Sequence, residues 1–123
     1  MALPTNHKFT EVQAEAYSPS VGASPVTAYT RAPFRGKIIK LGAVLYGTLT
    51  GDATVACTIN GTAVTGGTLT LTASGSAGGS TFTAIPTAAF NVNEDDYISF
   101  PPSGGNGTSI AAAFFAVVDK AGA

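Results

Sequence analysis

The sequence contains few of the side chains that catalysis and metal binding usually need. Its 123 residues include one cysteine, one histidine and no tryptophan. The cysteine, Cys57, cannot form a disulfide within the chain, and it falls at an apolar position of a strand pattern, where a buried and inert thiol is expected. The histidine, His7, has no nucleophile motif beside it, so neither a Ser-His-Asp nor a Cys-His arrangement is indicated. We therefore predict that the protein is not an enzyme and that it holds no cofactor or metal.

Charge is also scarce. Charged residues make up 11% of the chain and hydrophobic residues 45%, against roughly 25% charged residues in a typical soluble domain, and this balance argues against disorder. The net charge is −1, which provides no overall field to attract nucleic acid or an anionic membrane. One basic cluster has Phe34 as its aromatic neighbour and comprises Arg31, Arg35, Lys37 and Lys40. We expect neither nucleic acid nor a membrane as a partner.

A secretory signal and a membrane-spanning run are both missing. Residues 1–8 lack the apolar stretch of a signal peptide. The longest apolar stretch, residues 110–118, has about half the length of a membrane span. We therefore expect synthesis in the cytoplasm.

The first 33 residues differ in character from the rest of the chain. They show no sustained period of 2 or 3.6, and they contain prolines at irregular spacing, namely Pro4, Pro19, Pro25 and Pro33. Such prolines exclude a long helix and favour extended or turn conformations. We predict that residues 1–33 form an extended N-terminal arm with little core of its own, apart from a strand around Tyr29, and that residues 34–123 form the folded domain.

From residue 34 onward the pattern is that of β-strands. One expected strand has an apolar face made of Ile39, Leu41, Ala43 and Leu45. In the next, Val55, Cys57 and Ile59 alternate with more polar positions. The dipeptide Asn60-Gly61 predicts a two-residue hairpin, and Gly66-Gly67 predicts a second hairpin before an alternating strand that contains Leu69 and Leu71.

The C-terminal half adds further short strands. Residues 74–80 and 101–107 are loops by composition. Two or three strands are marked between and around them by Phe82, Phe90, Val92, Ile98 and Phe100. The last strand, residues 108–118, is apolar on both faces, so one face should meet the core and the other an interface. Seven or eight short strands with Gly-rich turns predict an all-β fold, an antiparallel β-sandwich or jelly-roll-like domain.

Two groups of polar or aromatic residues allow more than one interpretation. Glu94-Asp95-Asp96 is expected to be a turn with solvated charges; the alternative, a structural Ca²⁺ site, would need backbone carbonyls as additional ligands. Tyr17, Tyr29, Tyr46 and Tyr97 could form a sugar-binding platform, but without tryptophan we expect packing at the core edge or at an interface instead.

The order of motifs after residue 33 resembles a known family. The matching elements are the runs Phe34-Arg35-Gly36-Lys37-Ile38, Gly51-Asp52-Ala53-Thr54-Val55, Ile59-Asn60-Gly61, Gly66-Gly67-Thr68-Leu69-Thr70-Leu71, Ser74-Gly75-Ser76-Ala77-Gly78 and Val92 through Asp96 to Ile98. They resemble the small β-sandwich proteins that serve as capsid decoration, or cement, proteins of tailed bacteriophages. The resemblance covers residues 34–123. The arm matches only as a proline-bearing leader.

The resemblance implies a structural role on a virion. Proteins of that family are usually trimers on the outer capsid surface, where they bridge major capsid protein subunits, and an N-terminal arm often lies on the shell. By this resemblance we expect a homotrimer that binds the major capsid protein and stabilises the mature shell by mass action. Three linked contacts would make the attachment durable.

Candidate contact residues follow from this expectation. For the capsid contact they are His7, Lys8, Tyr29, Arg31, Arg35 and Lys37, and for the contact between copies they are Phe114, Phe115 and Val117. The alternative function is a carbohydrate-binding adhesion module of a phage head fibre, which predicts an exposed groove that contains tyrosines. A small hydrolase would lack any defensible set of catalytic residues.

Overall fold

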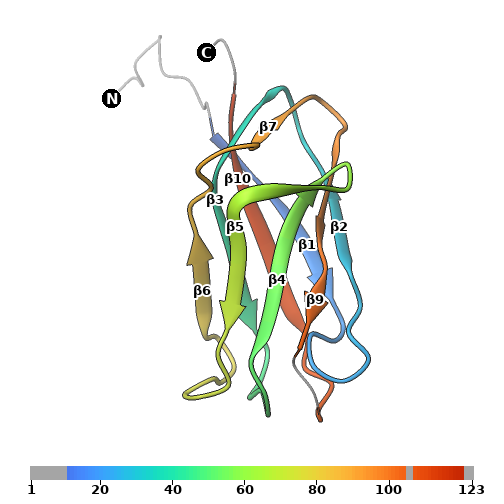
Figure 1. Ribbon diagram of the computed structural model, residues 1–123, viewed down its shortest axis with the longest axis vertical. Helices are drawn as coiled ribbons and strands as arrows, with labels where there is room; N and C mark the ends of the chain where they lie inside the picture. Colours follow the sequence, from blue (N-terminus) through green and yellow to red (C-terminus); the bar gives the residue numbers. More distant parts are fainter. Residues whose placement is uncertain (1–10, 105–106, 121–123) are drawn as a thin grey trace, which may run out of the picture.

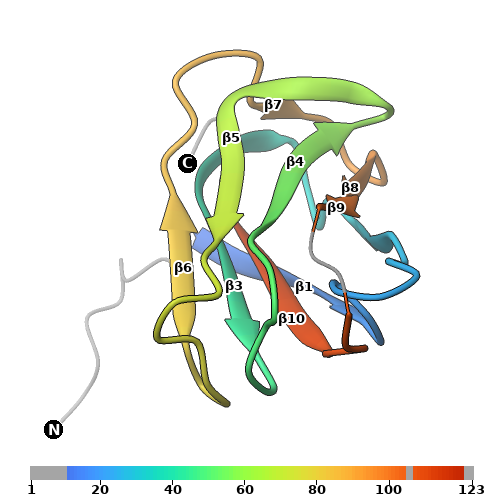
Figure 2. The same ribbon diagram turned by 60° about the horizontal axis from the view of Figure 1, so that its bottom comes forward.

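The computed structural model describes residues 11–104 and 107–120. Within these residues the protein is entirely β, and two antiparallel sheets pack face to face as a sandwich (Figures 1 and 2). The predicted fold class is therefore confirmed. The described part contains no helix that is long and apolar enough to cross a membrane.

The first sheet has five strands in the order β1-β10-β3-β6, and β7 pairs with β3 beside β6. Its strands are β1 (Glu11–Ser18), β3 (Gly36–Leu45), β6 (Thr81–Ala84), β7 (Asn91–Val92) and β10 (Ala112–Lys120). The second sheet has the order β2-β8-β4-β5, and β9 pairs with β4. Its strands are β2 (Ala28–Arg31), β4 (Ala53–Ile59), β5 (Thr62–Leu71), β8 (Tyr97–Phe100) and β9 (Pro102–Ser103).

The core lies between the sheets and follows the alternation of side chains along each strand. In β4 the buried residues include Val55, Cys57 and Ile59, as predicted, and Ala53 is buried as well. In β10 the buried residues are Ala112, Phe114, Ala116 and Val118, with half-buried residues between them. The rings of Phe114 and Phe100 stack with centroids 5.0 Å apart, which ties the first sheet to the second at the centre of the core.

The predicted arm is wrong for residues 11–33, because they belong to the sandwich. β1 pairs with β10 in the first sheet, and β2 pairs with β8 in the second. Val21, Ala28 and Ala32 are buried in the core. The alternation of Ala14, Ala16 and Ser18 with polar residues was present in the sequence, but small inward side chains give a weak hydrophobic signal. Residues 1–10 lie outside the described residues.

The predicted inward face of β3 is correct at three positions and wrong at one. Leu41, Ala43 and Leu45 are buried, but Ile38 is buried in place of Ile39. The register against β10 shifts at this point, since Lys40 pairs with Val117 and Ile38 pairs with Val118. Ile39 is the extra residue of a β-bulge, and a bulge reverses which side chains face the core.

The two predicted hairpins have different outcomes. Asn60 and Gly61 form the turn between β4 and β5, with φ of 51° and 89°, which confirms the first. The second prediction is wrong, because β5 continues through Gly66 and Gly67. The register against β4 shifts there, and Gly66 has φ of 75°. This dipeptide therefore makes an irregularity within one strand, and Figure 2 shows that β5 bends.

Neighbouring phenylalanines in β10 provide a test of this packing. Phe114 is 1% exposed, whereas Phe115 is half-buried on the outer face. We expect Phe114→Ala to lower the free energy of unfolding by about 3–5 kcal/mol, because it leaves a cavity against Phe100. Phe115→Ala should cost about 1–2 kcal/mol, because it removes partly exposed apolar area. Urea denaturation of both variants measures the difference, and equal losses would contradict the alternation.

Candidate functional site

The outer face of the first sheet is apolar along its centre. Residues that point away from the core come from β1, β10 and β3; we call this set the first-sheet face, and it comprises Gln13, Glu15, Tyr17, Lys40, Val44, Ala113, Phe115 and Val117. Register places Glu15 beside Phe115 and Gln13 beside Val117. The predicted two-sided apolar character of the last strand is therefore present, with one side in the core and the other on this face.

Phe115 lies flat on the neighbouring strand. Its Cα partner in β3 is Gly42, and a Cβ built on Gly42 would come within 2.0 Å of the Phe115 ring. Any larger residue at position 42 would lift the ring away from the sheet. Glycine at position 42 thus allows the Phe115 ring to lie against the sheet instead of projecting into solvent, so the surface is flat at this point.

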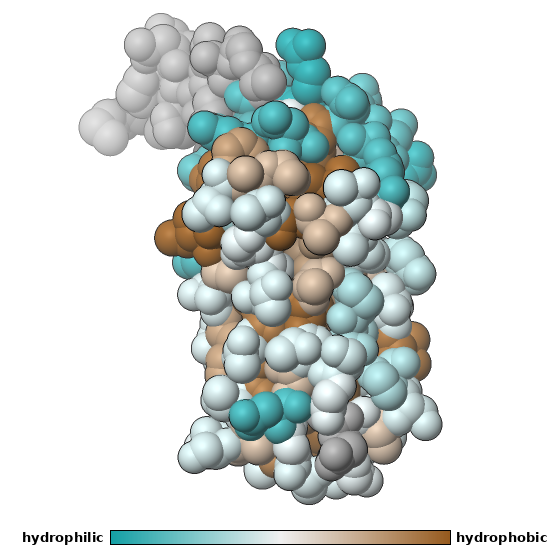
Figure 3. Space-filling model, viewed as in Figure 1, coloured by the Kyte–Doolittle hydropathy of each residue, from teal (hydrophilic) through white to brown (hydrophobic). Residues whose placement is uncertain are grey.

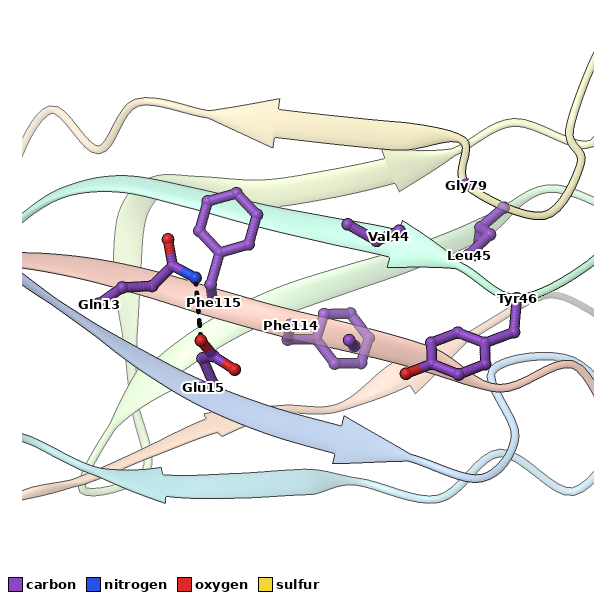
Figure 4. Close-up of a pocket in the computed structure, with 9 residues that line it drawn as sticks. Gln13, Glu15, Val44, Leu45, Tyr46, Gly79, Phe114 and Phe115 are labelled. Carbon is purple, nitrogen blue, oxygen red and sulfur yellow. Dashed lines mark hydrogen bonds between the residues drawn. The ribbon is translucent and has the colours of Figure 1, made fainter.

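A hollow of about 500 Å³ opens on this face. Figure 4 shows Phe115 and Val44 along the hollow, with Tyr46 at one end and Glu15 and Gln13 on the β1 side. Gln13 Nε2 donates a hydrogen bond to Glu15 Oε1 at 3.2 Å. The exposed Tyr46 ring packs edge-on against Tyr17, with centroids 5.8 Å apart. The lining therefore combines aromatic rings with one carboxylate and one amide.

The outer face of the second sheet has a different chemistry. Its outward positions on β4, β5, β8 and β9 are mostly hydroxyl-bearing. We call this set the second-sheet face; it comprises Thr54, Thr58, Thr68, Thr70, Ser103 and the buried Ser99, with Tyr29, Arg31 and Tyr97 at one end. Hydrogen bonds link the hydroxyls across strands, between Thr54 and Ser103 at 3.1 Å and between Thr58 and Ser99. This face is suited to contact with water.

Most charges gather at one end of the sandwich, where β1 begins and β10 ends. The basic members are Arg31, Arg35, Lys37 and Lys120, and the acidic ones are Glu11, Glu94, Asp95, Asp96 and Asp119. Figure 3 shows most of the strongly hydrophilic surface at this end. Among the described residues, the loops at the opposite end carry Asp52 as their charged side chain, and its Oδ1 accepts a hydrogen bond from Ala73 N at 2.7 Å.

The acidic run Glu94-Asp95-Asp96 forms the predicted turn. Asp96 Oδ2 accepts a hydrogen bond from the backbone N–H of Asn93 at 2.8 Å. This bond, together with one involving Asn60, holds the pKa of the Asp96 carboxyl below its usual value. Asp95 instead forms an exposed ion pair with Arg31, 3.1 Å between Oδ1 and Nη2. Within the described residues no group of carboxylate, cysteine and histidine side chains is arranged to hold a metal ion.

The predicted contact residues do not form a single patch. Tyr29 and Arg31 lie on the second-sheet face, whereas Lys37 lies on β3 of the first sheet and Arg35 precedes that strand. Phe115 and Val117 share the first-sheet face, but Phe114 is buried in the core and is not available for a surface contact. His7 and Lys8 lie outside the described residues. Sequence reasoning missed Gln13 and Glu15, because it had assigned β1 to the arm. It missed Val44 of β3, because only the core-facing side chains of that strand were singled out.

Cys57 has the predicted character. It is fully buried, and burial raises the pKa of its thiol from 9.0 to about 12. The reactive form of cysteine is the thiolate, which is almost absent at neutral pH with such a pKa. This side chain is therefore part of the core.

Comparison with solved structures places the fold in context. One similar chain belongs to the acidic stable capsid structure of Helicobacter pylori bacteriophage KHP30, with a TM-score of 0.55 and 12% sequence identity over 90% of this chain and 88% of that one. The fold is shared with a phage capsid chain. It is also shared with the carbohydrate-binding module CBM36, described in complex with calcium and xylotriose, at a TM-score of 0.50 and 16% identity over 90% and 98% of the two chains.

A third chain, from the cyanophage Pam1 capsid asymmetric unit, aligns with a TM-score of 0.46 and 11% identity over 98% of this chain and 92% of that one, which is too distant to support an argument. No family model matches the sequence. No curated protein matches it. At these identities the comparisons show the sandwich fold alone.

The turn at residues 93–96 gives a testable pH dependence. Because the pKa of Asp96 is lowered in the folded protein, its contribution to stability is present above the ordinary carboxyl pKa and is lost as the pH falls through the folded value. Asp96→Asn should therefore lower the melting temperature at pH 7, and the difference from wild type should shrink on acidification toward pH 3. Melting curves from pH 7 to pH 2.5 measure this. Glu94→Gln, in the same turn, is the control, and a difference that stays constant with pH would contradict the assignment.

Proposed function

We propose that the protein is a structural virion protein that decorates a phage capsid by binding the outer surface of its major capsid protein. The observation that carries this proposal is the end-to-end match with a chain of the KHP30 capsid. Because the alignment covers about nine-tenths of both chains, that chain is itself a small sandwich and not one domain of a much larger protein. A small sandwich in a capsid has the size and form of a decorating subunit.

The surfaces support the same role. The first-sheet face has an apolar centre, with Phe115, Val117, Val44 and Ala113 next to one another. Glu15 and Lys40 lie at its sides, beside Phe115 and Val117 respectively. Aromatic residues are enriched in the centres of protein interfaces and charged residues are depleted there. We assign this face to contact between copies of the chain in a trimer, with Phe115 and Val117 in the roles that the sequence analysis gave them.

The charged end is the remaining surface for the shell. It carries Arg35 and Lys37, which are exposed and free of any ion pair within the described residues, since the ion pair recorded there joins Arg31 and Asp95. The mixture of basic and acidic groups suits a partner surface that also carries both signs, and such complementarity fixes orientation more than it adds affinity.

A substitution on the first-sheet face tests the contact between copies. Phe115→Asp places a charge at the centre of the face and should convert a trimer into monomers, as measured by light scattering of the purified protein. Thr70→Asp, on the outer face of the second sheet, is the matched control and should leave the trimer intact. A wild-type protein that is monomeric, or a Phe115→Asp variant that is folded and still trimeric, would overturn the assignment.

Attachment to the shell is tested by cosedimentation. Purified protein is mixed with mature heads and with unexpanded proheads assembled from the genome that encodes the chain. We expect binding to mature heads, and a raised temperature of head disruption because the ligand binds only the mature state. Arg35→Glu combined with Lys37→Glu should weaken attachment by about tenfold or more. Thr68→Glu combined with Thr70→Glu, on the second-sheet face, serves as the control. Absence of binding to both kinds of head would refute decoration.

A further inference from the structure

Two exposed tyrosines lie together on the second-sheet face. Tyr29 is 65% exposed and Tyr97 is 42% exposed, and their ring centroids are 6.1 Å apart with an angle of 61° between the planes. With Thr30 and Arg31 they line a shallow hollow of about 410 Å³, which lies within the range of about 300–1,000 Å³ for small-ligand sites. The surrounding face carries hydroxyl groups, so the two rings form a small aromatic patch within a polar surface.

Arg31, which lines the hollow, forms an ion pair with Asp95. Arg31 Nη2 and Asp95 Oδ1 are 3.1 Å apart, and the two side chains are 70% and 67% exposed. An exposed ion pair of this kind adds little to stability. It leaves further N–H donors on the guanidinium and a second oxygen on the carboxylate for a ligand. Because the two charges cancel, the pair offers hydrogen-bond donors and acceptors without favouring a charged ligand over a neutral one.

The site is held in place by backbone hydrogen bonds. Asp95 N donates to Ala32 O at 3.0 Å, and Ala32 N donates to Asp96 O at 2.8 Å, which fixes Asp95 beside the end of β2. Tyr97 N donates to Asn60 Oδ1 at 3.1 Å, and Asn60 N donates to Tyr97 O at 2.9 Å. The backbone that carries Asp95 and Tyr97 is therefore fixed before a ligand binds, which lowers the entropic cost of binding.

We propose that this hollow binds a neutral saccharide. A pyranose has an apolar face of C–H groups that packs on an aromatic ring, and hydroxyls at its edge that donate to a carboxylate and accept from a guanidinium. Neighbouring hydroxyls of one sugar match the side-by-side donor and acceptor of Arg31 and Asp95. Glu94 and Asp96 flank Asp95 in the turn and disfavour acidic sugars by repulsion. The proposed site lies apart from the first-sheet face and adds a binding activity to decoration.

The first-sheet hollow provides an internal control. It also contains a pair of tyrosines in edge-to-face contact, Tyr17 and Tyr46. Its floor, however, consists of Val44, Ala113 and Phe115, and its one carboxylate, Glu15, is already hydrogen-bonded to Gln13. No guanidinium lines it. Two tyrosine pairs on opposite sheets thus allow the same substitution to be made inside and outside the proposed site.

The experiment is a titration of the ¹⁵N-labelled full chain with maltotriose, cellotriose, xylotriose and N-acetylchitotriose, and with 3′-sialyllactose as an acidic sugar. We expect at least one neutral trisaccharide to shift the amide signals of residues 29–31 and 95–97, with a Kd of about 1 mM or tighter. Tyr29→Ala and Asp95→Asn should each weaken binding by about tenfold. Tyr46→Ala should leave it unchanged, and melting curves confirm that each variant is folded.

Three results would overturn the proposal. One is the absence of shifts at about 10 mM of every neutral sugar, a concentration that detects even weak sites. Another is binding that Tyr46→Ala abolishes and Tyr29→Ala spares, which would place the sugar on the first sheet. The third is loss of head attachment in the folded Tyr29→Ala protein, which would assign Tyr29 to the shell contact. Sugar binding in a protein that fails to bind heads would support this site and refute decoration alone.

Discussion

The structure depends on one strand, β10, being apolar on both of its faces. β10 lies between β1 and β3 and is hydrogen-bonded to both. Its inward side chains fill the core, where Phe114 stacks on Phe100 of the opposite sheet. Its outward side chains form the centre of the first-sheet face. A strand that is apolar on both faces is usually buried on both sides, and residues 11–104 and 107–120 bury only one side of β10.

Sequence patterns were sufficient for the fold class and for the strands with large alternating side chains. β4 and the Asn60-Gly61 turn follow directly from alternation and from a dipeptide that accepts positive φ. β1 was missed because its inward residues are Ala14, Ala16 and Ser18. Side chains this small give too weak a hydrophobic alternation to indicate a strand. The partner strand accounts for one of them, since Ala16 pairs with Phe114, whereas Ala14 and Ser18 pair with Ala116 and Ala112.

Features that depend on the partner strand could not be read from the sequence. The bulge at Ile39 and the shift near Gly66 are set by the register against β10 and β4. The same holds for the candidate sites. Arg31 and Asp95 are far apart in the chain, and the pairing of β2 with β8 together with the bonds between Ala32 and the turn brings them together. The acidic run was predicted to be a turn, but the ion pair of Asp95 with Arg31, which lines the hollow with the two tyrosines, depends on this tertiary arrangement.

The two outer faces divide the surface by chemistry. The first-sheet face is apolar at its centre, and it is flat there because Phe115 lies on Gly42. The second-sheet face carries threonine and serine hydroxyls. The charges are concentrated at the end of the sandwich between these faces. The proposed contact between copies would use the first of these faces and leave the second exposed to water.

The single cysteine has a practical consequence for chemical labelling. Since Cys57 is fully buried with a pKa of about 12, thiol reagents at neutral pH should leave the folded protein unmodified. A cysteine introduced by substitution at an exposed threonine such as Thr70 would then be the one reactive thiol among the described residues. Dyes, spin labels or cargo molecules could be attached there at one defined point per chain, without first removing the native cysteine from the core.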